Sequence, residues 1–400
     1  MRTRFGHIAL VAVLALGVTS GLAAAGPLDN AATATWVGSW EAAPASGVDG
    51  TTNGYPNYSI RNVVHTSVGG SQARIRLSNR YGTSPVTFGH VTVGVQARVG
   101  TADAASLVTV KFHGAVSTTV AAGADIVSDP VPLRVPSNSN LLVTTFVPTP
   151  SGPVTYHPLA MQTSFFTRNG DHTADTWGTA FTETTSVWHY VTGVDVLNSS
   201  SKGTVVTLGD SITDGYGSTP NANHRWPNYL SERLGQRYGV DDAGISANRL
   251  LLDGGAGGEA AVKRLDEDVL SRTNVHSMIV LLGVNDIQQD PHQLDPTKIE
   301  GALQDIAQRA HAKGIRTIAS TILPFKGWSV WTEQLETVRQ AVNQWIRTSH
   351  AYDTVVDFDQ VTRDPADPQR MLPAYDCGDH LHPGDAGYQA MANAVDLNSL

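Results

Sequence analysis

The residues best suited to chemistry surround Ser211, where an apolar run ends. The run Val205-Val206-Thr207-Leu208 has the composition of a buried strand, and Gly209-Asp210-Ser211 follows it directly. A serine at the carboxyl end of such a strand faces the edge where parallel sheets bind ligands. Gly-Asp-Ser alone is more often a simple turn, but its place at a strand end predicts that Ser211 is a nucleophile.

A serine nucleophile needs a base and a group that orients the base. The stretch Asp379-His380-Leu381-His382-Pro383 supplies both near the C-terminus. Asp379 can bond Nδ1 of His382 and leave Nε2 to take the Ser211 proton. A metal site is the competing interpretation, but the two histidines are only two residues apart, and no other group at ligand spacing stands out. We therefore expect acid-base chemistry with no metal and no cofactor.

Acyl transfer also needs hydrogen-bond donors for the oxyanion that forms on the substrate. Asn285 follows an apolar run that ends at Leu282, so its amide can point into a site at that edge. Gly244 follows another short strand and, lacking a Cβ, can bring its N–H close to a substrate oxygen. With the N–H of Ser211, these groups make three predicted donors.

The elements that must position these residues alternate between strand and helix from residue 203 to residue 400. Such alternation predicts a parallel sheet with helices on both faces, an α/β fold. We expect strands at 204–208, 240–243, 277–282, 315–323 and 354–358, and helices at 226–238, 259–270, 296–313, 333–350 and 383–395. The polar stretch 197–203 is the predicted linker to the preceding domain.

Residues 31–198 have a different pattern, in which short strands are separated by turn residues and no helix of useful length is expected. Many short strands of this kind predict a β-sandwich, of jelly-roll type. The strands expected are 59–67, 73–79, 91–97, 107–112, 141–147, 162–167 and 187–196. The aromatic residues of this domain either pack its core or stack on sugar rings: Trp36, Trp40, Tyr55, Tyr58, Trp177 and Trp188.

Residues 1–25 have the pattern of a secretory signal peptide. Arg2 and Arg4 precede an apolar stretch of about ten residues, and Ala23-Ala24-Ala25 provides a small-residue cleavage site. The apolar stretch is too short for a membrane span, which needs roughly 20 residues. We therefore expect an extracellular protein without a transmembrane segment in its mature chain.

The composition excludes some partners. Loss of Arg2 and Arg4 leaves 25 basic and 36 acidic residues and takes the formal net charge from −9 to −11, so nucleic acid is not an expected partner. The single cysteine, Cys377, rules out an internal disulfide. It lies two residues before Asp379 and is either a nucleophile or buried apolar filler, of which we favour filler. We expect a monomer.

The four stretches that hold Ser211, Gly244, Asn285 and His382 resemble, in order, the four signature blocks of the GDSL (SGNH) hydrolase family, over about residues 203–397. The resemblance implies a flavodoxin-like sheet and an esterase or acylhydrolase without a metal. It also implies that Ser211 is the nucleophile, His382 the base and Asp379 its orienting group, with Gly244 and Asn285 as oxyanion donors. Ile212 departs from the family's leucine with little change in volume.

The expected function is therefore hydrolysis of carboxylic esters through an acyl-enzyme. Secretion and an aromatic β domain favour short-acyl or carbohydrate esters as substrates. Two alternatives stay open: a lipase or lysophospholipase that acts on lipid esters, and a non-catalytic carbohydrate-binding protein. Secreted bacterial proteins that resemble this chain carry such a β domain, but the four blocks imply no role for it.

Overall fold

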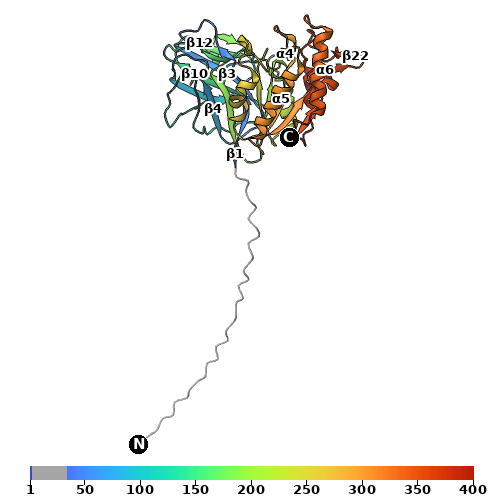
Figure 1. Cartoon of the computed structure of the whole chain (residues 1–400). Coiled ribbons are helices and arrows are strands. Elements are labelled where there is room, and N and C mark those ends of the chain that lie inside the picture. Colours follow the sequence, from blue (N-terminus) through green and yellow to red (C-terminus); the bar gives the residue numbers. More distant parts are fainter. Residues whose placement is uncertain (2–33) are drawn as a thin grey trace. The chain divides into compact units, whose positions relative to one another are not determined.

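The computed structural model describes Met1 and residues 34–400 (Figure 1). The chain divides into Met1–Thr33 and one compact unit, Ala34–Leu400, and every strand and helix described belongs to the second unit. The predicted signal peptide lies outside the described residues. Among the residues described, no helix is both long enough and apolar enough to cross a membrane.

Antiparallel strands make up the N-terminal part of this unit. A core of aliphatic side chains, among them Val37 and Ile75 on one sheet and Val93 and Val143 on the other, joins two sheets into a sandwich. The four-stranded sheet has the order β1 (Thr35–Glu41), β15 (Val191–Asn198), β4 (Ala73–Ser78), β9 (Asp125–Val127). The six-stranded sheet has the order β13 (Glu183–Thr185), β12 (Ser164–Thr167), β3 (Tyr58–Thr66), β10 (Ser139–Val147), β6 (His90–Val95), β7 (Val108–Thr109).

Two small sheets complete the sandwich. They are formed by β14 (Trp188–His189), β11 (Thr155–His157) and β2 (Ser46–Gly47), and by β5 (Val86–Phe88) and β8 (Thr118–Val120). The predicted strand at 187–196 is interrupted at Tyr190, whose φ of 61° is incompatible with extended backbone. Within residues 34–198 the only helix described is the single 3₁₀ turn Gly178–Ala180, so the all-β prediction is confirmed.

The C-terminal part is a parallel sheet of five strands. Their order is β17 (Gly239–Gly244), β16 (Thr204–Gly209), β18 (Val275–Leu281), β19 (Arg316–Ser320), β20 (Thr354–Val356). In chain order this is 2-1-3-4-5, the flavodoxin-like arrangement, so the predicted fold class is confirmed. Every residue of the central strand β16 is buried.

Eight α-helices are described in this part: α1 (Ser211–Asp214), α2 (Trp226–Leu234), α3 (Ala261–Leu265), α4 (Val284–Gln288), α5 (Pro296–His311), α6 (Glu333–Thr348), α7 (Phe358–Thr362) and α8 (Asp385–Ala394). A hairpin of β21 (Arg363–Asp364) and β22 (Asp367–Met371) precedes α8. Helix α2 packs with α8, and α5 packs with α3 and α6, as on the two faces of one sheet. Figure 1 shows α5 and α6 in orange and red.

Two predicted helices are shorter in the structure, and local residues explain why. Helix α2 ends at Leu234 because Gly235 adopts a φ of 59° and leaves the helical path. The stretch predicted as one helix over 259–270 divides into α3 and a π-helical turn, Asp266–Leu270. Helix α5 ends at His311, two residues earlier than predicted, and Gly314, with a φ of 73°, follows it.

The sandwich packs directly on the parallel sheet through β1 and β17. Gly38 N–H donates to Thr204 Oγ1 at 2.8 Å, and the Oγ of Ser67 lies 2.9 Å from the Val240 nitrogen that donates to it. Glu41 of β1 and Arg272 form an ion pair with both side chains buried. These hydrogen bonds and this ion pair tie the two parts together.

Candidate active site

Ser211 lies where strand β16 gives way to the short helix α1. Asp210 caps that helix by accepting the Ile212 N–H at 3.0 Å, and Ser211 is its first residue, 6% exposed. A Cβ on Gly209 would overlap the Thr213 side chain, so the tight turn requires glycine there. The serine is therefore held on fixed backbone at the carboxyl end of the central strand.

The structure brings Ser211, His382 and Asp379 together in one hydrogen-bonded line. Ser211 Oγ is 2.8 Å from His382 Nε2, and His382 Nδ1 is 2.6 Å from Asp379 Oδ2. The other oxygen, Asp379 Oδ1, accepts the N–H groups of Leu381 and His382, each at 2.9 Å. Partial burial alone would raise the pKa of Asp379, but these hydrogen bonds outweigh it and hold the pKa well below its usual range.

Two aromatic rings that sequence reasoning missed enclose His382. The Tyr216 ring centroid is 4.4 Å from that of the imidazole, and the Trp328 ring meets it edge-on at 6.3 Å. Only 7% of His382 is exposed. The rings restrict the imidazole to the orientation in which Nε2 faces Ser211.

A second histidine–aspartate pair lies on the same loop. His380 Nδ1 is 2.6 Å from Asp376 Oδ2, and Asp376 Oδ1 accepts the N–H groups of Gly378 and His380. Its geometry matches that of the His382–Asp379 pair, but the serine hydroxyl bonds His382 and not His380. The structure therefore distinguishes the two histidines by the hydrogen bond of His382 with Ser211.

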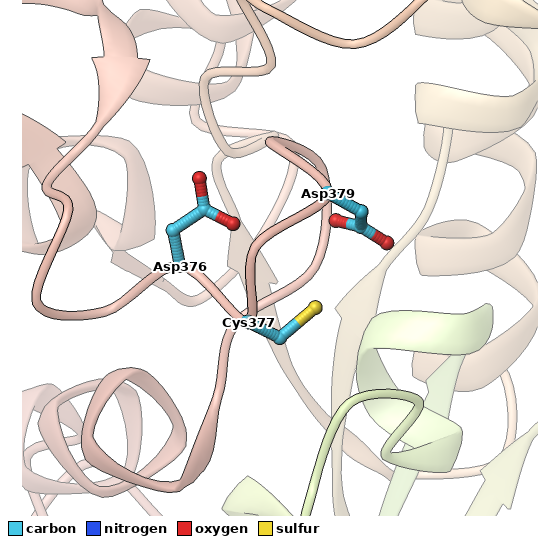
Figure 2. Close-up of side chains that lie close together, drawn as sticks. All are labelled: Asp376, Cys377 and Asp379. Atoms are coloured by element: carbon cyan, nitrogen blue, oxygen red, sulfur yellow. The ribbon is translucent and has the colours of Figure 1, made fainter.

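Figure 2 shows Asp376, Cys377 and Asp379 gathered on this loop, with ligand atoms within 4.8 Å of one another. Every carboxylate oxygen of the two aspartates already accepts an N–H or an imidazole bond. The cluster thus serves the loop's own hydrogen bonding. Cys377 is exposed, so our prediction that it is buried filler is wrong.

The amide of Asn285 has a fixed orientation near the start of α4. Its Oδ1 accepts the Gln288 side-chain amide at 2.8 Å, and Gln288 Oε1 in turn accepts the Trp328 indole N–H at 2.9 Å. These bonds identify which end of the Asn285 amide is the nitrogen. This nitrogen, Nδ2, donates one hydrogen to Asn248 O at 2.9 Å. The second hydrogen on Nδ2 remains for another acceptor.

Gly244 does not offer the donor that we predicted. Its N–H donates to Asp242 Oδ1 at 3.0 Å, and a Cβ at this position would overlap the backbone of Asp214 in α1. The glycine is needed for close packing beneath the serine helix. Its assignment as an oxyanion donor is therefore wrong.

Ala247 provides an N–H that sequence reasoning missed. Its φ of 63° is left-handed, an uncommon conformation for alanine, and within residues 34–400 its N–H has no acceptor. The preceding Ser246 bonds Asp214 at the end of α1, and the following Asn248 bonds Asn285. Ala247 thus lies between the serine helix and the asparagine amide. A glycine would have indicated this turn in the sequence, whereas alanine concealed it.

The stretch of the chain that contains these site residues matches a known protein family. Residues 207–390, just under half of the chain, match the model of the GDSL-like lipase/acylhydrolase family. No curated protein matches the chain.

Solved structures resemble about half of the chain. A GDSL-like lipase from Bacteroides thetaiotaomicron is 21% identical, covers 48% of this chain and 84% of its own, and has a TM-score of 0.38. A carbohydrate acetylesterase from Sinorhizobium meliloti is 16% identical (48% and 95% covered, TM-score 0.39). A member of the lipolytic G-D-S-L family from Veillonella parvula is 19% identical (48% and 94%, 0.37). Likenesses this weak carry no information on substrate.

The family match includes the end of strand β16, which leads to Ser211, and the loop that carries His382. This chain therefore carries a GDSL-like lipase/acylhydrolase domain over residues 207–390.

Proposed function

We propose that this protein hydrolyses carboxylic esters through a covalent acyl-enzyme. The observation that carries the proposal is the line of short contacts from Ser211 Oγ through His382 to Asp379, at 2.8 and 2.6 Å. Such a line supplies a nucleophile, a base and a group that keeps the base in the correct tautomer.

In the first step, Ser211 Oγ attacks the ester carbonyl carbon and its proton passes to His382 Nε2. The negative charge that develops on the carbonyl oxygen takes hydrogen bonds from the N–H groups of Ser211 and Ala247 and from Asn285 Nδ2. Collapse of this intermediate breaks the bond to the alcohol, which leaves with the proton from His382. Water then attacks the acyl-enzyme, with His382 again as the base, and releases the acid and the serine.

Hydrolysis of p-nitrophenyl acetate by the purified protein and by Ser211→Ala tests this mechanism. We expect the variant to lose at least a thousandfold in kcat, because the remaining groups cannot form the acyl-enzyme. Ser320→Ala is the matched control, since Ser320 is a buried serine that donates to Val280 O in the sheet and lies outside this line of contacts. Equal rates for Ser211→Ala and the wild-type protein would refute the assignment.

For the substrate, we propose a short-acyl or carbohydrate ester. A cavity of about 300 Å³ on the sandwich supports a sugar: it is lined by Tyr55, Tyr58, Phe166 and Arg168, with Ile60, Thr184, Thr185 and His189 completing it. The rings of Tyr55 and Tyr58 are parallel at 4.9 Å, and the Arg168 guanidinium lies 5.3 Å from the Tyr58 ring centroid. Pockets of this size with an aromatic lining and a few polar groups bind small ligands.

The substrate classes are separated by rates on esters of increasing acyl length and on an acetylated oligosaccharide. A carbohydrate esterase would favour acetyl groups, and Tyr58→Ala would lower the rate on the oligosaccharide but not on p-nitrophenyl acetate. Rates that rise with acyl length would indicate the lipase alternative, and sugar retention without turnover the binding-protein alternative. We also propose export of a monomer, to be tested by the N-terminus and the hydrodynamic size of the secreted protein.

A further inference from the structure

A buried histidine of the β-sandwich reaches the helix that carries Ser211. His157, at the end of β11, is 3% exposed. Its Nδ1 lies 2.7 Å from Ala43 O, and its Nε2 lies 3.0 Å from Asp214 Oδ1 and 3.1 Å from Leu159 O. Since every partner is an acceptor, both ring nitrogens must carry hydrogen. Burial alone would lower the pKa of His157, but the Asp214 carboxylate and the two carbonyls outweigh it and raise the pKa.

Asp214 connects His157 to the turn that carries Ala247, one of the proposed oxyanion donors. It is the last residue of α1, three residues after Ser211. While its Oδ1 bonds His157, its Oδ2 accepts both the N–H and the hydroxyl of Ser246 at 2.8 Å. Ser246 directly precedes Ala247. One buried carboxylate therefore joins the sandwich, the serine helix and the turn that presents the Ala247 N–H.

Arg225 fastens the same end of α1 to the sandwich a second time. Its Nε donates to Asp214 O at 2.7 Å, and its Nη2 donates to Ala160 O. The guanidinium carbon also lies 5.5 Å from the Trp188 ring centroid of β14. His157 of the sandwich thus binds the Asp214 carboxylate, and Arg225, just before α2, binds the Asp214 backbone and joins it to the sandwich.

We propose that His157 is a positioning residue for catalysis. Through the His157–Asp214–Ser246 contacts, the β-sandwich holds helix α1, which carries Ser211, and the Ala247 turn in the relative positions that catalysis requires. The proposal rests on the proposed ester hydrolysis. It assigns the sandwich a role in the chemistry of the other part of the chain. A donor displaced by a fraction of an ångström stabilises the oxyanion poorly, although the substrate still binds. Loss of the His157 contact should therefore lower kcat more than it changes KM.

His157→Gln in the full chain tests the proposal, because glutamine has a single amide nitrogen and cannot donate to Ala43 O and to Asp214 at once, as the two ring nitrogens do. We expect kcat on p-nitrophenyl acetate to fall at least tenfold with KM changed less than threefold. Affinity for a trifluoromethyl ketone, which mimics the oxyanion, should fall by a similar factor. Titration of the reactive serine with a p-nitrophenyl phosphonate counts folded sites, so kcat is taken per titrated site.

Ser67→Ala is the matched control, since the Ser67 hydroxyl also joins the sandwich to the sheet, at Val240, but bonds no residue of α1. We expect its kcat per site to stay within twofold of the wild type. If His157→Gln does not fold, Ser246→Ala removes only the hydroxyl bond to Asp214, and we expect a threefold or greater loss in kcat per site.

An unchanged kcat per site in His157→Gln, or in Ser246→Ala where the first variant does not fold, would overturn the positioning role. An equal loss in Ser67→Ala would also overturn it, because general loosening of the contact would then explain the effect. Failure of the proposed function is distinct: Ser211→Ala would then match the wild type in rate.

Discussion

Asp379→Asn is the substitution that most directly tests how the site works. The asparagine Oδ1 can still accept the N–H groups of Leu381 and His382, which lie 2.9 Å from Asp379 Oδ1, so the loop should keep its shape. The other end, 2.6 Å from His382 Nδ1, becomes an N–H₂ group. Two donors cannot face each other, so the imidazole must place its hydrogen on Nε2. That nitrogen then cannot accept the proton of Ser211.

The expected loss follows from this tautomer. The equivalent change in a serine protease triad lowers kcat about 10⁴-fold, which corresponds to about 5.4 kcal/mol in the activation free energy. The contacts here are short, at 2.8 and 2.6 Å, and the Asp379 carboxylate is fully ionised at neutral pH, since its pKa lies well below the usual range. We therefore expect a loss between about 10³- and 10⁴-fold, with a melting temperature close to that of the wild type.

Asp376→Asn is a matched control on the same loop. It alters a histidine contact of equal length, His380 Nδ1 to Asp376 Oδ2 at 2.6 Å, but that histidine does not bond the serine. Steady-state rates on p-nitrophenyl acetate should stay within threefold of the wild type for this variant. Our account of the site would be refuted if Asp379→Asn kept a tenth of the wild-type kcat, or if Asp376→Asn lost as much as Asp379→Asn.

Three further predictions concern the oxyanion donors and a buried carboxylate. Asn285→Ala removes one donor and should lower kcat roughly 10²–10³-fold with little change in KM, whereas retention of more than a third of kcat would exclude this role. Ala247→Gly keeps the N–H but relieves a left-handed φ of 63°; a gain of about 0.5–1 kcal/mol in the free energy of unfolding is expected in urea titrations, and a loss would contradict it. Burial raises the pKa of Asp241 from 3.8 to about 7, and the nearby Arg272 only partly offsets this effect. Because the folded chain holds that proton more tightly, Asp241 favours folding at low pH and this contribution is lost as the pH rises towards 7, by up to about 1.4 kcal/mol per pH unit. Asp241→Asn should therefore gain thermal stability relative to the wild type between pH 5 and pH 8, and a parallel pH dependence would refute this assignment.

Much of the site was predictable because its signals are local. The apolar run before Ser211 identifies a buried strand, and a side chain at its carboxyl end must face the ligand edge of a parallel sheet. Asp379 and His382 are three residues apart, so one loop conformation suffices to join them. The alternation of strands and helices from residue 203 onward predicts the sheet and the longer helices. The short helices α1, α4 and α7 and the division of the predicted 259–270 helix were not predicted.

The donors could not be read in the same way. The direction of a backbone N–H depends on the path of the whole loop, which residue spacing does not specify. The N–H of Gly244, for example, points to Asp242 and not into the site. The Ala247 turn is held by Asp214 and Asn285 through its neighbours, far along the chain in both directions. The contact of His157 with Asp214 spans 57 residues and two different folds.

The sequence alone determined which residue types could carry the chemistry, since the proposed nucleophile, base and orienting acid lie at a strand end and within one short loop. Only the tertiary structure decided which N–H groups are free to meet a substrate oxygen and which part of the sandwich supports them. The physical reason is that hydrogen-bond donors act within about 3 Å and along a direction. Both conditions are set by long-range packing of the two parts of the chain.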